Sequence, residues 1–365
     1  MKRVFIEENV SFGYRRESVR RVCVVAFCVV LLLASISACA IADKYAAEFL
    51  KVGAGARALG MGGAFVALAD DASAIYWNPA GIVSVDNVQL EAMHAEQFGN
   101  LINYDFVAVA FPISGQDARK ACIGVAVIRL AVDDIPYTKN LAWEDYGVDQ
   151  TPDTHDFGEG NGKWDPGERI ILDEGKIVWK SNADMALLLS YATKLTERIS
   201  VGGTFKLVRQ EIMDNSSLGA GVDLGAIYSL DKSTSFGLVI SDATTTQLVW
   251  DTGHHEFVAP TVRLGGQYTR KIGPLEGVGT VAGDMEIGFE NRSSANLSLA
   301  DAVTIDFKAG VEYWLKRTVA IRAGLDAGRF TAGTGARFSR FGFDYAFLSH
   351  KDLDNSHRVS ASVRF

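Results

Sequence analysis

Apolar and polar residues alternate along much of the chain after about residue 88. Between Leu218 and Leu230, an apolar side chain occupies every second position, and glycine, aspartate or serine fills most positions between. The same alternation returns in residues 304–313 and again in residues 356–365. A period of two predicts β-strands with one apolar and one polar face.

The predicted strands are long for a soluble protein. They run nine to thirteen residues, whereas strands of soluble domains average about five or six. Their polar positions carry charges and glycines along the whole length, as the interior of a membrane barrel does. A soluble β-sandwich is the alternative, and both features argue against it.

The connections between strands are of two kinds. Short turns, such as 195–198, 231–233 and 316–318, alternate with longer stretches near 132–180 and 241–258. Tight turns on one side and long loops on the other are typical of outer-membrane barrels. We therefore predict an antiparallel β-barrel of about 14 strands over residues 88–365, with both termini periplasmic and 132–180 extracellular.

Aromatic residues support a membrane position. Strands that run toward the short turns end with an aromatic residue in the apolar phase: Tyr191, Tyr228, Tyr268, Tyr313, Phe338 and Phe365. Such a girdle places rings at the depth of the lipid headgroups. The expected location is the outer membrane of a Gram-negative-type bacterium, with membrane lipid as the surrounding partner.

The first forty residues read as an export signal. Arginines at 15, 16, 20 and 21 precede an apolar run from Val22 to Ile36, and small residues follow to Ala40. This order predicts a secretory signal peptide over 1–40, and the apolar run itself is too short for a comfortable membrane span. A lipoprotein signal that lipidates Cys39 is the alternative. After cleavage at Ala40 only Cys122 remains, so no internal disulfide is expected.

The charge balance bears on possible partners. The whole chain has a net charge of −8 and residues 1–40 carry six Lys/Arg and three Glu, or +3, which leaves −11 for the remainder. Such an acidic chain lacks the excess of positive charge that a nucleic-acid-binding protein carries.

One segment before the first predicted strand departs from the barrel pattern. It ends in Trp77, Asn78, Pro79, Ala80 and Gly81. Proline fixes its own φ and keeps the preceding residue out of the helical region, while glycine permits a tight reversal. The motif alone predicts a turn, but the many apolar residues around it require burial.

The same segment carries a dense family signature. Phe49-Leu50-Lys51-Val52-Gly53, the run from Ala56 to Ala64, Asp70-Asp71-Ala72 and the Trp77–Gly81 motif together resemble the start of the PorV/PorQ family. This family is related to the FadL-type transporters of long-chain fatty acids. In FadL-type proteins the N-terminal segment folds back into the lumen as a hatch that contains an Asn-Pro-Ala motif.

The resemblance implies a structure and two functions. Residues 41–87 would form a hatch inside the barrel, and Trp77–Gly81 would shape the wall of a largely apolar ligand pocket. The protein would bind or pass hydrophobic molecules, or would serve protein export to the cell surface, as PorV-like proteins do with the type IX secretion system. Its partners would then be hydrophobic small molecules, or secreted proteins and secretion components.

The longest predicted loop contains a candidate cation site, in the stretch DFGEGNGKWDPGE. Oxygen-bearing side chains at EF-hand-like spacing around a sharp glycine turn suit Ca²⁺. Phe157, at the first position of that spacing, cannot bind metal, so its neighbour would have to serve. The candidate ligands are Asp156, Glu159, Asn161, Asp165 and Glu168. A solvated acidic loop without metal is the alternative, and the sequence leaves both open.

Catalytic motifs are missing from the sequence. It contains no G-x-S-x-G elbow and no H-E-x-x-H pair, so we expect no enzymatic activity and no other cofactor. A structural outer-membrane protein or a lipase-type enzyme of the outer membrane are the alternatives.

Overall fold

A computed structural model shows the protein as a closed antiparallel β-barrel. The structure describes residues 46–97, 99, 101–114, 120–138, 142–171, 177–273, 276–289, 295–299, 303–350 and 355–365. The predicted signal peptide lies outside the described residues.

Fourteen strands of the described chain make up the barrel wall. They are β1 (Gln89–Gln97), β2 (Ile102–Ser114), β3 (Lys120–Tyr137), β6 (Val178–Lys194), β7 (Ile199–Ile212), β8 (Asn215–Ser229), β9 (Thr234–Ser241), β12 (Thr261–Ile272), β13 (Gly277–Gly288), β15 (Val303–Leu315), β16 (Val319–Asp326), β17 (Arg329–Phe338), β18 (Phe341–Leu348) and β19 (Ser356–Arg364). The short strands β10 (Thr246–Trp250), β11 (His255–Val258) and β14 (Leu297–Leu299) extend the wall locally.

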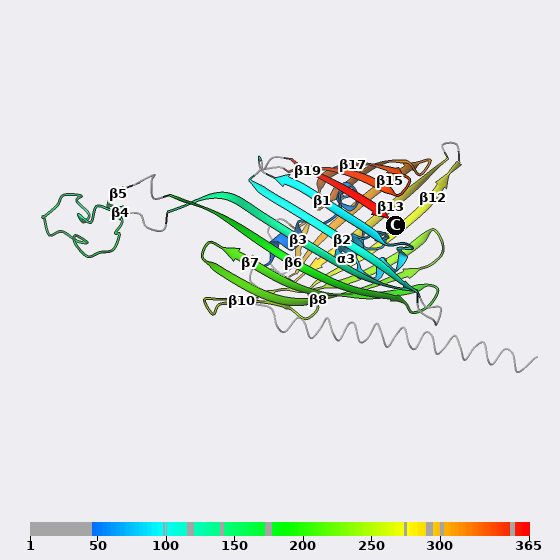
Figure 1. Cartoon of the computed structure of the whole chain (residues 1–365), viewed down its shortest axis with the longest axis horizontal. Helices are drawn as coiled ribbons and strands as arrows, with labels where there is room; N and C mark the ends of the chain where they lie inside the picture. Colours follow the sequence, from blue (N-terminus) through cyan, green and yellow to red (C-terminus); the bar gives the residue numbers. More distant parts are fainter. Residues whose placement is uncertain are drawn as a thin grey trace, which may run out of the picture.

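The barrel closes where its first and last strands meet. β1 pairs with β2 on one side and with β19 on the other, and Gln89 lies opposite Arg364. Each of the fourteen wall strands pairs with the wall strand before it and the one after it in the chain, and all these pairings are antiparallel (Figure 1). The antiparallel barrel of about fourteen strands predicted from the sequence is confirmed.

The two ends of the barrel differ. The turn end carries the turns 195–198, 230–233 and 316–318 together with the C-terminus, where the Phe365 amide donates to the Val88 carbonyl at 2.9 Å. The loop end carries the connection between β3 and β6. Ala47 lies toward the loop end, because its amide donates to Gln210 close to the end of β7.

The outward face of the wall is apolar and the inward face is polar. Along β15, Phe307 and Val311 are about half exposed on the outside, while Asp306 and Glu312 are buried on the inside. The predicted alternation thus has its apolar phase facing outward, as in a membrane-spanning barrel. The girdle residues Tyr191, Tyr228, Tyr268, Phe338 and Phe365 are exposed on this outer face, and Tyr313 is half-buried there.

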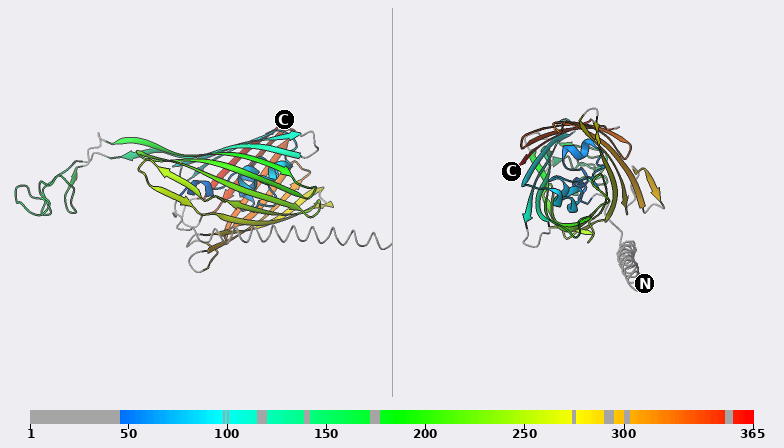
Figure 2. Two further views of the ribbon diagram at one scale, coloured as in Figure 1. Left: turned by 90° about the horizontal axis from the view of Figure 1, so that it is seen from below. Right: turned by 90° about the vertical axis from the view of Figure 1, so that its right-hand side faces the viewer.

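Residues 46–85, called the lumen segment below, pack inside the barrel (Figure 2). The segment contains four short helices: η1 (Glu48–Lys51), α2 (Ala56–Gly60), α3 (Ala74–Trp77) and η2 (Pro79–Ser84). Small residues dominate it, so its backbone lies close to the wall, and its larger apolar side chains, such as Phe65 and Ile75, are fully buried. Among the described helices, none is long and apolar enough to cross a membrane.

The wall rises farthest at β3 and β6. These strands continue to Tyr137 and from Val178, so the loop expected over 132–180 is shorter, and a bulge separates Val132 from Ile135. A two-stranded sheet of β4 (Ala142–Trp143) and β5 (Ile170–Ile171) then carries residues 144–169 well beyond the barrel (Figure 1). Residues 142–171 are called the loop module below.

Candidate functional site

The Trp77–Gly81 turn is fixed by its asparagine. The Asn78 side chain accepts from the Ala80 amide at 3.2 Å and begins helix η2, whose first residue is Pro79. The Asn78 amide group donates to the Val66 carbonyl at 2.8 Å and to the Ala226 carbonyl of β8 at 3.3 Å. One buried side chain therefore holds the turn, a second part of the lumen segment and the barrel wall together.

Glycines allow this turn to touch its surroundings. A Cβ on Gly81 would lie 2.1 Å from the Ala69 carbonyl oxygen, and one on Gly225 of β8 would lie 2.2 Å from Asn78 Oδ1. Real side chains cannot approach so closely. The turn and the inward face of β8 therefore fit each other only because both contribute glycine.

Inward polar side chains of the wall bind the irregular backbone of the lumen segment. Asp284 of β13 accepts from the amides of Phe65 and Val66 at 2.7 and 2.9 Å. Ser360 of β19 accepts from the Ala56 amide at 2.8 Å. Buried backbone groups outside regular structure need such partners, and the polar phase of the strands provides them.

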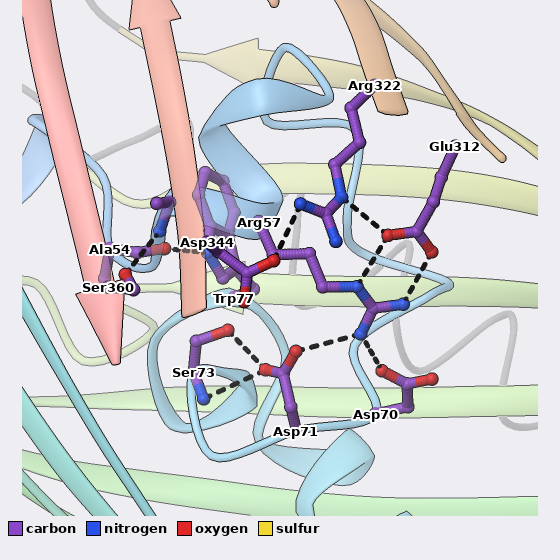
Figure 3. A network of polar contacts seen from close by, with 11 residues as sticks. Ala54, Arg57, Asp70, Asp71, Ser73, Trp77, Glu312, Arg322, Asp344 and Ser360 are labelled. Atoms are coloured by element: carbon purple, nitrogen blue, oxygen red, sulfur yellow. Dashed lines mark hydrogen bonds and ion pairs between the residues drawn. The ribbon is translucent and has the colours of Figure 1, made fainter. Parts of the chain in front are cut away.

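A buried ion network joins the lumen segment to β15 (Figure 3). Arg57 makes a bidentate pair with Glu312, at 3.0 Å from Nε and 2.9 Å from one terminal nitrogen, and also pairs with Asp70 and Asp71. Glu312 accepts a further bond at 2.7 Å from Arg322 of β16. The Glu312 side chain is 2% exposed, whereas that of Asp70 is 48% exposed. Glu312 is thus the buried anion that two arginines share.

A cavity of about 510 Å³ lies between the lumen segment and the wall at the loop end. Trp77 forms part of its floor, and its indole nitrogen donates to the Ala54 carbonyl at 2.7 Å. Leu50, Val52 and Leu59 add apolar surface from the same segment. Asn78, Pro79, Ala80 and Gly81 lie against β6, β7 and β8 and not among the lining residues.

The wall side of the cavity is charged, which differs from the largely apolar pocket that the sequence predicts. Lys206 lies between Asp223 and Asp242, at 2.8 and 2.6 Å, and Lys308 lies between Glu286 and Asp326, at 3.2 and 3.6 Å. These lysines are paired with wall carboxylates. The cavity therefore offers an apolar floor and a polar wall whose charges are largely compensated.

The candidate calcium ligands lie in the loop module, and their side-chain oxygens face backbone amides. Glu159 accepts from the Asp153 and His155 amides, Glu168 from the Gly147 and Asp165 amides, and Asp156 from the Asp149 amide. Asn161 donates to Asp165 at 2.6 Å. Among the described residues, no group of three or more His, Cys, Asp or Glu side chains is arranged to hold a metal ion.

Calcium binding stays a prediction of the sequence, and limited proteolysis tests it. If the ion draws these oxygens together, Ca²⁺ should protect the loop module from cleavage at its exposed residues. Asp165→Ala/Glu168→Ala should abolish that protection, while Glu211→Ala on β7 should keep it. Equal cleavage with and without Ca²⁺ would support the solvated loop.

Replacing Asn78 with alanine tests the role of the turn. The change removes three hydrogen bonds and leaves the Val66 carbonyl without its side-chain donor, which costs about 1–3 kcal/mol. We expect faster hydrogen exchange in residues 64–82 and unchanged exchange in the barrel strands. Asn103→Ala, at a half-buried position near the start of β2, is the matched control. Unchanged exchange in the lumen segment would show that the turn does not depend on Asn78.

Sequence reasoning located the motif but not its partners in the wall. Asp284 lies 219 residues from Phe65, and Glu312 lies 255 residues from Arg57, the residues of the lumen segment that they contact. Their only signal in the sequence is a charge in the inward phase of a predicted strand. That signal shows an inward polar group but does not show which one it meets across the lumen.

One protein-family model matches part of the sequence. Residues 31–110 match the model of an uncharacterised protein family, UPF0164, and this region includes the whole lumen segment and β1. No curated protein matches the sequence.

Several solved structures are similar to this fold. They include the toluene transporter TbuX of Ralstonia pickettii (11% identity, covering 86% of this chain and 98% of that one, TM-score 0.48). They also include the toluene transporter TodX of Pseudomonas putida (13%, 85% and 97%, 0.48) and a FadL homologue of Pseudomonas aeruginosa (11%, 85% and 98%, 0.46). The likeness is one of architecture.

Proposed function

We propose that the protein is an outer-membrane barrel that binds or passes small molecules with a large apolar part, and that the lumen segment is its hatch. The observation that carries this proposal is the cavity at the loop end, which is lined jointly by the lumen segment and the wall. A concave site with an apolar floor and a few polar groups suits a small organic ligand. The turn end, where the first wall strand begins and the last wall strand ends, would face the periplasm.

The polar wall narrows the class of ligand. Paired lysines and carboxylates favour a molecule that also presents hydrogen-bonding groups over a pure hydrocarbon. Trp77 lies under the Arg263 guanidinium, whose carbon is 5.8 Å from the ring centre. An aromatic or aliphatic body would rest on Trp77 and Leu59, with its polar end toward β12 and β15.

Binding of N-phenyl-1-naphthylamine, a fluorescent apolar amine, tests the proposal. Detergent micelles also take up this dye, so binding in the cavity must be distinguished from binding in the micelle. For this purpose Leu50, which lines the cavity, is replaced by cysteine (Leu50→Cys) and labelled with a bulky maleimide that fills the site. We expect saturable binding by the parent and its loss in the labelled variant. Leu101→Cys lies in the exposed connection between β1 and β2, away from the cavity lining. This variant, labelled in the same way, should bind normally. Equal binding by both labelled variants would refute a lumen site.

Protein export is a second candidate, in line with the resemblance to the PorV/PorQ family and its type IX secretion partners. The observation that favours it is the loop module, which exposes Phe157 (81%) and Trp164 (48%) beyond the barrel. Both side chains are therefore accessible to a protein partner outside the barrel. Deletion of residues 144–169 should then abolish display of secreted cargo at the cell surface while dye binding continues. Normal display would remove this candidate.

A further inference from the structure

Cations surround the barrel at its turn end. Arg198 lies in the β6–β7 turn, Lys232 in the β8–β9 turn, Arg270 close to the end of β12, Lys316 and Arg317 in the β15–β16 turn, and Arg340 in the β17–β18 turn. All six are exposed. They are called the basic rim below.

The basic rim has few anions near it. Among the described residues, no carboxylate forms an ion pair with any of these six cations, and the side-chain carboxylates at this end are Asp86, Glu197, Asp231 and Glu276. Asp86 pairs with Lys120 at 2.6 Å, and this hydrogen bond holds the pKa of Asp86 below its ordinary value. Asp231 accepts from the amides of Ser233 and Thr234 in its own turn.

The loop end has the opposite charge. The loop module contains eight Asp/Glu and two Lys/Arg, and Asp133, Asp214 and Asp251 add carboxylates at the same end. The described chain is therefore polarised along the barrel axis, with the basic rim at the turn end and the acidic loop module at the loop end. Net charge alone does not produce this arrangement, because the whole chain is acidic.

The depth of the basic rim is fixed by the aromatic girdle. Arg270 follows Tyr268 by two residues on the same outward face of β12, and Tyr268 is 49% exposed. The Arg340 guanidinium carbon lies 5.3 Å from the centre of the Phe341 ring, which also faces outward. Girdle aromatics lie at the level of the lipid headgroups, so these guanidinium groups lie there too.

We propose that the basic rim binds phosphate-bearing anionic headgroups in the lipid leaflet at the turn end. Arginine and lysine pair well with phosphate oxygens. The cations are spread over five hairpins around the circumference, which fits a planar layer that surrounds the barrel, whereas a protein partner would meet one compact patch. Binding here fixes the depth of the barrel and favours one orientation of its axis.

Spin-labelled lipids measure this preference directly. The full chain, in bilayers of phosphatidylcholine with phosphatidylglycerol, should immobilise labelled phosphatidylglycerol several-fold more than labelled phosphatidylcholine. In low salt we expect the variant Arg270→Gln, Lys316→Gln, Arg317→Gln, Arg340→Gln to lose this preference. Each cation should contribute up to about five-fold to the binding of phosphatidylglycerol relative to phosphatidylcholine. Molar salt should remove it in the parent as well.

A matched variant separates the basic rim from total charge. Arg129→Gln, Lys163→Gln, Arg169→Gln, Arg209→Gln removes four cations at the loop end and should keep the preference. Heat-modifiable migration on gels confirms that each variant is folded, and the pairs Arg270/Arg340 and Lys316/Arg317 serve if the quadruple variant is not. No preference in the parent, or equal loss in both variants, would overturn the proposal.

Two further experiments test whether the anion bound by the basic rim is a lipid headgroup, free phosphate or an acidic protein. At matched ionic strength, inorganic phosphate should displace the labelled lipid no better than chloride does, and selective displacement would instead indicate a site for free phosphate. Polyglutamate added to the protein in detergent should bind weakly. Tight polyglutamate binding that the basic-rim variant abolishes, with the lipid preference unchanged, would assign the basic rim to an acidic protein.

Discussion

A barrel without its lumen segment is expected to conduct ions freely. A wall of fourteen strands encloses a lumen that stays open unless something fills it. Deletion of residues 46–85 removes the helices, the Trp77–Gly81 turn and the floor of the cavity, and leaves a ring of polar side chains facing water. Planar bilayers containing the deleted form should show large, steady conductance, while the parent should be almost silent.

The control for this deletion removes a shorter segment elsewhere in the chain. Residues 144–169 lie beyond the barrel on β4 and β5, so their loss should leave the bilayer current unchanged. A deletion of 46–85 that folds, as judged by heat-modifiable migration, but conducts no more than the parent would contradict the role of a hatch. Conductance in both deletions would point to damage of the wall instead.

Replacement of Glu312 with alanine is expected to release the lumen segment without removing it. Arg57 and Arg322 would then lose the carboxylate that they share. Arg57 would keep Asp70 and Asp71, and Arg322 would keep Asp344 at 2.7 Å. Removing one partner of a buried ion pair costs up to about 3–5 kcal/mol. We expect brief current bursts in planar bilayers and faster hydrogen exchange in residues 54–66. Hydrogen exchange in the strands of the barrel wall should not change.

The same network contains a control of the same charge. Asp70 also pairs with Arg57, but half of its side chain is exposed, so Asp70→Asn should cost at most about 1 kcal/mol. Equal effects of Glu312→Ala and Asp70→Asn would show that burial of the network does not hold the segment. An effect of Glu312→Ala on the barrel strands alone would place its role in the wall.

The wall was predictable from the sequence because its pattern is local. A period of two, which each strand shows independently, indicates which residues form strands and which side chains face outward, including those of Tyr268 and Phe365. The bounds of β3 and β6 were less predictable, because strands that continue beyond a membrane lose their apolar face. The motif at Asn78 was recognisable, and its bond to the Ala80 amide follows from ordinary turn chemistry.

The composition of the cavity was not predictable in the same way. The sequence shows that Trp77 and Leu59 need burial, but not that they form only the floor. The opposite wall, with Lys206 and Lys308 between carboxylates, is assembled from strands far apart in the chain. Which inward residue of one strand meets which part of the lumen segment depends on the stagger of the closed barrel, and no local pattern contains that information.

The bonds between wall and lumen segment also set an order of events during folding. Ala56 bonds Ser360 across 304 positions of the chain, and the Gly60 carbonyl accepts from Thr331 across 271. Contacts of such high sequence separation form slowly, because the loop between them must close first. The short helices η1, α2, α3 and η2 are too small to be stable alone. The segment that leaves the ribosome before the barrel strands is therefore ordered only after the final strand has closed the wall.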